Sequence, residues 1–294
     1  MFEQQLVNGF TLGLIYALIA VGYTMVYGVI ELINFAHGEI YMLGAFLTLS
    51  FLSTGMPLVL AVILAMLAVA AIGVLLDIVA YRPLREAPRL AALITAIGMS
   101  IFLQNLAMII WGSRPLPFPR QALPAFFGEP AFSFSDVTIS WMQVIIYVVA
   151  LLLMVALNLI ITKTRIGTAM RALAQNRTAA ALMGINVNRV ISFTFALGSG
   201  MGAVAGVMVS MYYNTMYPTM GYLAGVKAFA AAVLGGIGSV PGAMLGGVVL
   251  GIAETLGAGY ISSPYRDGVA YAVRILVIIF RPSGFLGRSM VEKA

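Results

Sequence analysis

Long runs without a charged residue constrain this chain more than any other feature. Trp141 to Thr162, Val190 to Val226 and Ala228 to Ala253 contain no Asp, Glu, Lys or Arg. An α-helix crosses the hydrocarbon core of a bilayer with about 20 apolar residues. Only 9% of the residues are charged, whereas a soluble domain carries about 25% and needs polar groups over its surface. The sequence therefore predicts an integral membrane protein rather than a soluble enzyme.

Hydrophobic segments divide the chain into candidate membrane helices. The segments at 40–54 and 224–238 are short enough to be broken or re-entrant helices, which a bilayer tolerates where protein covers the irregular backbone. The first segment lacks a basic leader and an obvious cleavage site, so we expect a retained span and not a signal peptide. The predicted fold is an all-α polytopic bundle with 8 or 9 transmembrane segments in one domain, 1–294. The candidates are roughly 7–30, 40–54, 57–80, 91–111, 141–161, 190–213, 224–238, 242–260 and 268–280.

Lys and Arg in the loops predict the orientation, because short cytoplasmic loops are rich in them. The loops at 81–89 and 162–189 and the C-terminal tail are basic. The loop at 112–140 is charge-balanced and contains five prolines, which favour stiff, extended backbone. We expect the basic loops and the C-terminus in the cytoplasm and the proline-rich loop outside, as a cap or a docking surface. The side of the N-terminus depends on whether 40–54 crosses fully.

The basic loop Lys163 to Arg189 is too long for a simple turn. Its middle, Thr168 to Met183, is rich in good helix formers, and Gly167 and Gly184 are plausible ends. A helix lying there would present Arg171 and Arg177 to a docking partner. The alternative is an inert loop whose charge only reflects the orientation rule.

Glycines recur at four-residue spacing in the last third of the chain. The two series are Gly198, Gly202 and Gly206, and then Gly238, Gly242 and Gly246, continued by Gly247 with Gly251. Such spacing lets helix backbones approach closely, and we favour packing within one subunit over a specific dimer face. The glycine-rich run 235–242 predicts a break between two half-segments.

Two charged residues flank that break. A hairpin turning near Val240 and Pro241 would bring Lys227 and Glu254 to one depth, and we predict an ion pair because unpaired charge there is expensive. The pair has either a structural or a functional role. Four further polar residues are expected to bond across helices: Asp77, Gln104, Asn105 and Asn158.

The segment Asn34 to Glu39 contains the only histidine, His37. A lone histidine titrates near neutral pH, so a proton relay is one reading. We favour the other, a hydrogen-bonded helix break with Gly38 at the bend.

Several function classes lack their motifs. No G-x-x-x-x-G-K-[ST] phosphate loop, H-E-x-x-H or G-x-S-x-G occurs. One histidine and no cysteine leave little for a metal site. We therefore expect no cofactor and no nucleic-acid partner, and a transporter whose energy comes from partner subunits.

Long motifs resemble the H-type membrane subunit of the bacterial high-affinity branched-chain amino-acid permease. The similarity extends over almost the whole chain. It is carried by the runs at Asn8–Gly28, Ile33–Glu39, Thr95–Asn105, Ala224–Phe229 and Ala232–Ala243.

The resemblance implies an ABC importer in the bacterial inner membrane. A second, M-type permease subunit would complete the pathway, two cytoplasmic ATPases would drive it, and a periplasmic binding protein would deliver Leu, Ile or Val. Gly167 to Ile185 is similar to the coupling helix that docks on the ATPase. Ala179, Ala180 and Gly184 fall where a degenerate alanine-glycine signature would lie.

In this picture the two helix breaks would line the pathway and supply polar groups for the charged ends of the substrate. The same family implies urea, short amides or a sugar as alternative solutes, and a stand-alone channel or secondary carrier also remains open. The expected pathway residues are Asn34, His37, Glu39, Gly235, Gly238 and Gly242.

Overall fold

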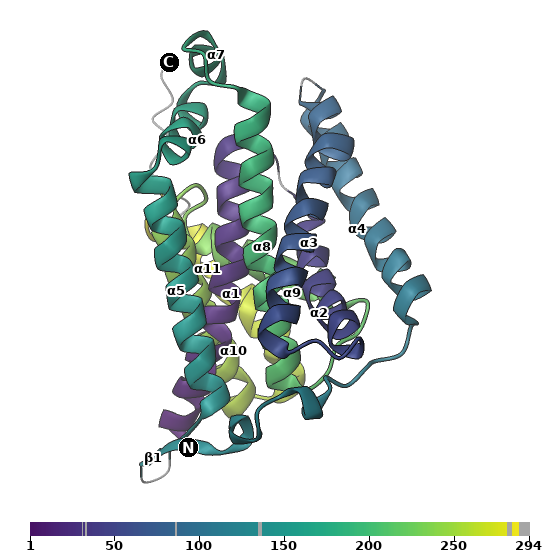
Figure 1. Cartoon of the computed structure of the whole chain (residues 1–294). Coiled ribbons are helices and arrows are strands. Elements are labelled where there is room, and N and C mark those ends of the chain that lie inside the picture. The colour runs from purple at the N-terminus through teal and green to yellow at the C-terminus, as the bar shows by residue number, and fades with distance from the viewer. Residues whose placement is uncertain (31, 33, 86, 135–136, 281–283, 288–294) are drawn as a thin grey trace.

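The computed structural model describes residues 1–30, 32, 34–85, 87–134, 137–280 and 284–287. Each of the nine predicted segments contains a helix in this part of the chain (Figure 1). The C-terminal tail expected in the cytoplasm lies outside the described residues, apart from 284–287. The helices are α1 Phe2–Ile30, α2 His37–Ser53, α3 Leu58–Leu76, α4 Arg89–Trp111, α5 Trp141–Lys163, α8 Val187–Tyr213, α9 Met220–Gly235, α10 Val240–Tyr260 and α11 Arg266–Phe280.

Helix length separates full spans from shorter elements. Six helical stretches of the described chain are long and apolar enough to cross a bilayer: α1, α4, α5, α8, α10, and α3 extended to Leu84 by a π turn and a 3-10 turn. The other three, α2, α9 and α11, have 17, 16 and 15 residues. Two of these are the segments that the sequence marks as broken or re-entrant.

The proline-rich loop and the basic segment lie at opposite ends of the bundle (Figure 1). At one end, the Gln4 side chain exchanges two hydrogen bonds with the backbone of Thr138, at 2.7 and 3.1 Å. At the other end, Arg177 Nε donates to the carbonyl of Val29 at 3.3 Å. Helix α1 therefore runs from the proline-rich loop to the basic segment. The N-terminus lies on the side of the proline-rich loop, which the sequence alone left open.

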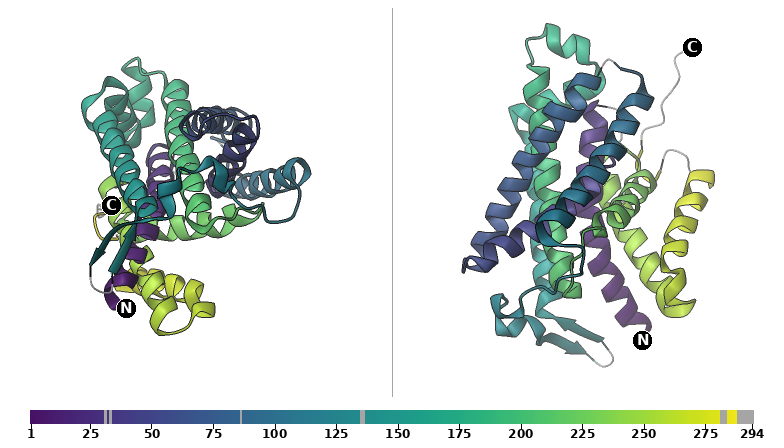
Figure 2. Two further views of the ribbon diagram at one scale, coloured as in Figure 1. Left: turned by 60° about the horizontal axis from the view of Figure 1, so that its bottom comes forward. Right: turned by 90° about the vertical axis from the view of Figure 1, so that its right-hand side faces the viewer.

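The proline-rich loop is more ordered than the predicted extended backbone. Two 3-10 turns, Arg120–Ala122 and Ala125–Gly128, precede a hairpin of β1 Pro130–Phe134 and β2 Val137–Ser140. Figure 2 shows this hairpin beside the N-terminus in both views. Strands form because β-branched and aromatic residues alternate on both sides of a short connection.

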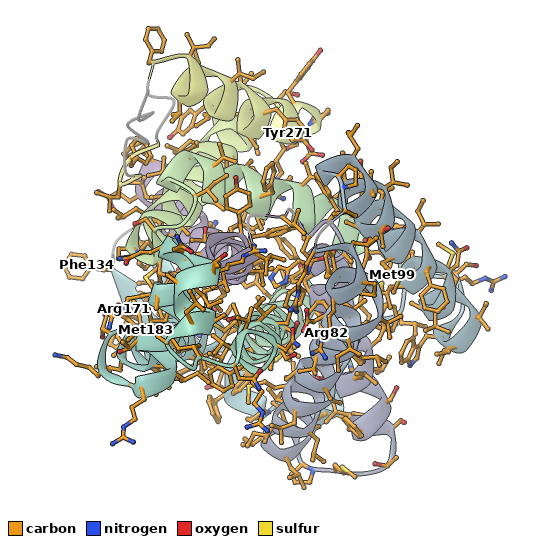
Figure 3. All side chains as sticks on the ribbon, turned by 90° about the horizontal axis from the view of Figure 1, so that it is seen from above. Arg82, Met99, Phe134, Arg171, Met183 and Tyr271 are labelled. Atoms are coloured by element: carbon orange, nitrogen blue, oxygen red, sulfur yellow. The ribbon has the colours of Figure 1, made fainter. Side chains whose placement is uncertain are left out.

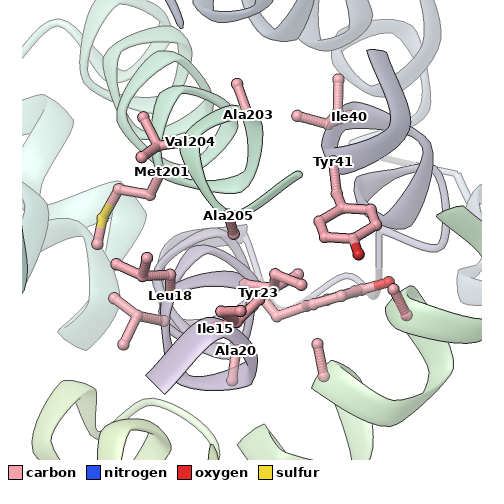
Figure 4. Close-up of a cluster of buried hydrophobic side chains, with 14 of the residues drawn as sticks. Ile15, Leu18, Ala20, Tyr23, Ile40, Tyr41, Met201, Ala203, Val204 and Ala205 are labelled. Atoms are coloured by element: carbon pink, nitrogen blue, oxygen red, sulfur yellow. The ribbon is translucent and has the colours of Figure 1, made fainter. Parts of the chain in front are cut away.

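The core lies where α1, α2 and α8 meet (Figure 4). In the most apolar window, 89% of α1 and 78% of α8 are buried, compared with 22% for each of α3, α4 and α5. Helices α3, α4 and α5 expose many large apolar side chains. Soluble proteins rarely expose extended apolar surfaces. These helices present an apolar surface that suits lipid or a second membrane subunit better than water.

Small residues allow the central helices to touch. A Cβ on Gly206 of α8 would overlap the carbonyl of Tyr41 on α2, and a Cβ on Gly251 of α10 would overlap the backbone of Gly13 on α1. Both approaches occur within one chain. The predicted packing within a subunit is confirmed at these positions.

Candidate functional site

The basic segment between α5 and α8 folds as two short helices, α6 Arg165–Gln175 and α7 Arg177–Leu182. The single helix predicted over Thr168 to Met183 is therefore wrong. Asn176 breaks it, because its Oδ1 accepts a hydrogen bond from the Ala179 amide at 2.9 Å and starts a second helix. Gly167 lies inside α6, where a Cβ would overlap the carbonyls that end α5.

The predicted docking residues divide into exposed and inward-facing sets. Arg171 and Ala179 are exposed, and Gly184 ends α7 with φ +82°. Arg177 is half-buried against α1, and Ala180 is buried. Arg177 thus places its positive charge near the C-terminal end of α1, where the helix dipole is negative.

Sequence reasoning missed an apolar tip on α7. Leu182 and Met183 are each 83% exposed. Figure 3, viewed from this end of the molecule, labels both Met183 and Arg171. Two apolar residues after an alanine run, beside a basic helix, are a signal that could have identified this tip.

The first break joins α1 to α2 inside the bundle. Tyr81 donates to Asn34 Oδ1 at 2.6 Å, and both residues are buried. Glu39, also buried, accepts at Oε1 from Ser100 at 2.9 Å and from Gln104 at 2.8 Å, both on α4. The predicted hydrogen-bonded break is present, and Ser100 and Gln104 join the site.

Two polar atoms in this break stay unsatisfied. Within the described chain, His37 Nε2 and Glu39 Oε2 are buried without a hydrogen-bond partner. Unpaired buried polar groups are rare and call for an explanation. The prediction that Gly38 forms the bend is wrong. Gly38 lies in the first turn of α2, where a Cβ would overlap the carbonyl of Gly221 on α9.

The second break separates α9 from α10. Gly236 and Gly238 have φ +102° and +92°, and Ser239 Oγ caps α10 by accepting from the Gly242 amide at 3.2 Å. The chain therefore turns directly before Val240 and Pro241, near the predicted position, and Pro241 lies in the first turn of α10, where proline fits.

Two of the predicted glycines in that run serve packing. Gly235 and Gly242 touch backbone to backbone, so they close the base of the hairpin. A small recess lies nearer to α1 and α9, and the ring of Phe229 on its wall is 5.9 Å from that of Phe35. This recess therefore lies between the two breaks. It is lined by Tyr23, Thr24, Tyr27, Phe229, Ala232 and Ile237.

Lys227 and Glu254 are in contact, with Nζ 2.8 Å from Oε1. The hairpin geometry thus gives the expected pairing. The structure adds two charges from α11: Arg266 Nε is 2.6 Å from Glu254 Oε1, and Lys227 Nζ is 2.6 Å from Asp267 Oδ1. Tyr16 also donates to Glu254 at 3.2 Å. The four charges balance, which lowers the cost of burying them.

The other polar residues expected to cross helices behave differently from one another. Asp77 and Gln104 bond to neighbouring helices. Asn105 instead donates to the carbonyl of Ile101 in its own helix, and Asn158 is exposed. The expectation is wrong for Asn105, because a helix carbonyl one turn away is the nearest acceptor.

Comparison with known proteins identifies the family. A family model described as branched-chain amino acid transport system / permease component matches residues 5–280. The chain belongs to this permease family. It is 50% identical to the high-affinity branched-chain amino acid transport system permease protein BraD of Pseudomonas aeruginosa, covering 99% of this chain and 98% of that one.

Two further relatives differ in their sequence identity to this chain. The high-affinity branched-chain amino acid transport system permease protein LivH of Escherichia coli K12 is 48% identical, over 99% of this chain and 97% of its own length. The ribose import permease protein RbsC of Haemophilus influenzae is 28% identical, over 90% and 80%. No solved structure matches the chain. Together with its apolar helices, these relatives show a polytopic transport permease.

Proposed function

We propose that this permease is the membrane-spanning subunit of an ABC importer for branched-chain amino acids. Separate ATPase subunits supply the energy, and the α6–α7 pair is the element through which they act. The observation that carries this proposal is the α6–α7 end of the bundle. It presents an exposed arginine and an apolar tip on two short helices that are anchored to α1.

A docking role fits the chemistry of this end. Apolar side chains in the centre of an interface and arginine at its edge are the usual composition of a protein contact. Leu182 and Met183 provide the apolar centre, and Arg171 provides the charge. Arg177 and Ala180 hold the pair against the bundle, so that a push on α6–α7 reaches the spanning helices.

The remaining topology follows from this assignment. The α6–α7 end faces the cytoplasm, and the N-terminus and the loop at 112–140 face the periplasm, where a substrate-binding protein delivers its ligand. Helix α11 then ends on the cytoplasmic side, and so does the C-terminus. A second, M-type permease subunit completes the pathway in the inner membrane.

Alternating access is the mechanism that these parts support. Closure of the ATPases moves the coupling helices, and the bundle changes between outward-open and inward-open states. Half-helices that begin inside a membrane aim backbone dipoles at a substrate's charged groups. The start of α2, with Asn34, His37 and Glu39, and the Gly236–Ser239 turn supply such groups beside an apolar recess.

The test is uptake by the complete complex in proteoliposomes. The permease is co-purified with its second permease subunit and ATPases and supplied with the binding protein and ATP. We expect ATP-dependent accumulation of leucine, isoleucine and valine. Uptake by the permease alone, without ATPases, would replace the proposal with a channel or a secondary carrier.

Urea and ribose are the competing solutes for the same assay. The relative named as a ribose import permease covers most of this chain, so the family fold serves a sugar elsewhere. Uptake of ribose or urea in preference to leucine would support the importer function but refute branched-chain amino acids as its substrates.

A further inference from the structure

A polar network at the cytoplasmic end of α3 and α8 remains unassigned. Its centre is Asp77, whose side chain is fully buried at the start of the π turn Asp77–Tyr81. π turns occur inside helices mostly at functional sites. A buried carboxylate in a spanning segment is also costly unless it is paired. Both features mark this turn as more than a connection.

Asp77 joins the loop after α3 to the first turns of α8. Its Oδ1 accepts from Arg85 at 2.5 Å, and its Oδ2 accepts from Ser192 of α8 at 2.7 Å. The same arginine donates to Asn188 of α8 at 2.5 Å, and Arg82 donates to Ser192 at 3.0 Å. Two arginines and one carboxylate thus fasten the end of α3 to α8.

This junction has one neighbour toward the cytoplasm. Helix α8 begins at Val187, three residues after Gly184 ends α7. Asn186 caps α8 by accepting from the Arg189 amide at 3.1 Å. A displacement of α7 therefore reaches the start of α8 through a very short connection.

The junction has a second neighbour inside the membrane. Tyr81, at the last position of the π turn, donates to Asn34 and lies 5.3 Å, ring to ring, from Phe195 of α8. Asn34 lies three residues before the start of α2, which contains His37 and Glu39. One set of contacts thus runs from α7 through α8, Asp77 and Tyr81 to the intramembrane break.

We infer that Asp77 and Tyr81 are positioning residues that transmit movement of the α6–α7 pair to the start of α2. This inference rests on the proposed importer function and names the residues that couple its two ends. The carboxylate makes α3 follow α8, and the tyrosine hydroxyl makes the α1–α2 break follow α3. Neither residue needs to touch the transported solute or ATP.

The experiment uses the complete complex in nanodiscs and compares two ATPase rates. One is basal, and the other is measured with substrate-loaded binding protein. The variants are Asp77→Asn and Tyr81→Phe, with Tyr222→Phe as control because Tyr222 is 58% exposed. We expect Asp77→Asn and Tyr81→Phe to assemble into the complex and to keep the basal ATPase rate. Their stimulated rate and leucine uptake fall by about fivefold or more, the lower range of allosteric coupling.

Two further variants separate transmission from stability. Asp77→Glu keeps the charge and should restore part of the stimulation. Asn34→Ala combined with Tyr81→Phe should lose no more stimulation than Asn34→Ala alone, because Asn34→Ala already removes the contact that Tyr81→Phe removes.

Three results decide the inference. Normal stimulation and uptake in Asp77→Asn and Tyr81→Phe overturn it, while wild-type uptake leaves the importer function standing. Parallel loss of assembly and basal rate in Tyr81→Phe, the milder change, also overturns it and assigns the network a purely structural role. Absence of ATP-driven uptake in the wild-type complex refutes the proposed function itself.

Discussion

Neutralising Glu254 tests how the charge cluster stabilises the bundle. Its carboxylate is fully buried and is shared by Lys227 and Arg266, with a hydrogen bond from Tyr16. Glu254→Gln keeps the size of the side chain but leaves two positive groups facing a neutral amide. Asp267, which is 49% exposed, then balances Lys227 alone.

The expected loss follows from that residual pairing. Removing one partner from a buried ion pair costs about 3–5 kcal/mol. Because Lys227 keeps its contact with Asp267, we expect the lower value, about 3 kcal/mol. For a large chain, about 2 °C of melting temperature is lost per kcal/mol, so the melting temperature should fall by about 6 °C.

Thermal unfolding of the purified permease in detergent measures this change. Glu3→Gln is the matched control, because Glu3 is exposed in the first turn of α1. Lys227→Met combined with Glu254→Gln should lose less than the sum of the single variants, since both single variants remove the same Lys227–Glu254 contact. A Glu254→Gln variant that melts with the wild type, or strictly additive losses, would refute the reasoning.

Three other outcomes check the packing, the topology and the docking surface. Gly206→Val should abolish the monodisperse protein peak in size-exclusion chromatography, whereas Gly98→Val, with open space around it, should leave the peak unchanged. Because the chain has no cysteine, Phe134→Cys should react with an impermeant maleimide in spheroplasts, and Met183→Cys only after permeabilisation; the reverse pattern would invert the topology. Arg171→Glu should weaken co-purification of the ATPase subunits without changing the melting temperature of the permease, and unchanged co-purification would remove this arginine from the contact.

Helix positions could be predicted because the bilayer enforces them. Each charge-free stretch must satisfy its backbone internally, so a hydrophobic run of sufficient length implies a helix. The break at 235–242 could also be predicted, since the glycines and the proline of this run disfavour a continuous helix. The segments at 40–54 and 224–238 were candidates for broken or re-entrant helices because they are shorter than a full span.

Local competition explains the prediction that failed in the basic segment. The composition of Thr168 to Met183 favours one helix, yet Asn176 satisfies an amide of the following turn and ends the first helix. Whether an asparagine caps or continues a helix depends on the direction of the chain around it. Here the residue that follows the asparagine, Arg177, contacts the end of α1.

The contacts that define the candidate sites come from long-range pairing, which spacing along one chain does not reveal. Lys227 and Glu254 could be paired because they flank one visible turn. Asp77 and Ser192 are 115 positions apart, and Tyr81 and Asn34 are 47 apart, with no turn to relate them. What the sequence does provide is the constraint that a buried carboxylate in a spanning helix needs a partner. For Asp77 the partners are Arg85 and Ser192, and Ser192 lies on α8, the helix that follows the α6–α7 pair. The pairing that burial of Asp77 requires is therefore also the contact on which the proposed transmission depends.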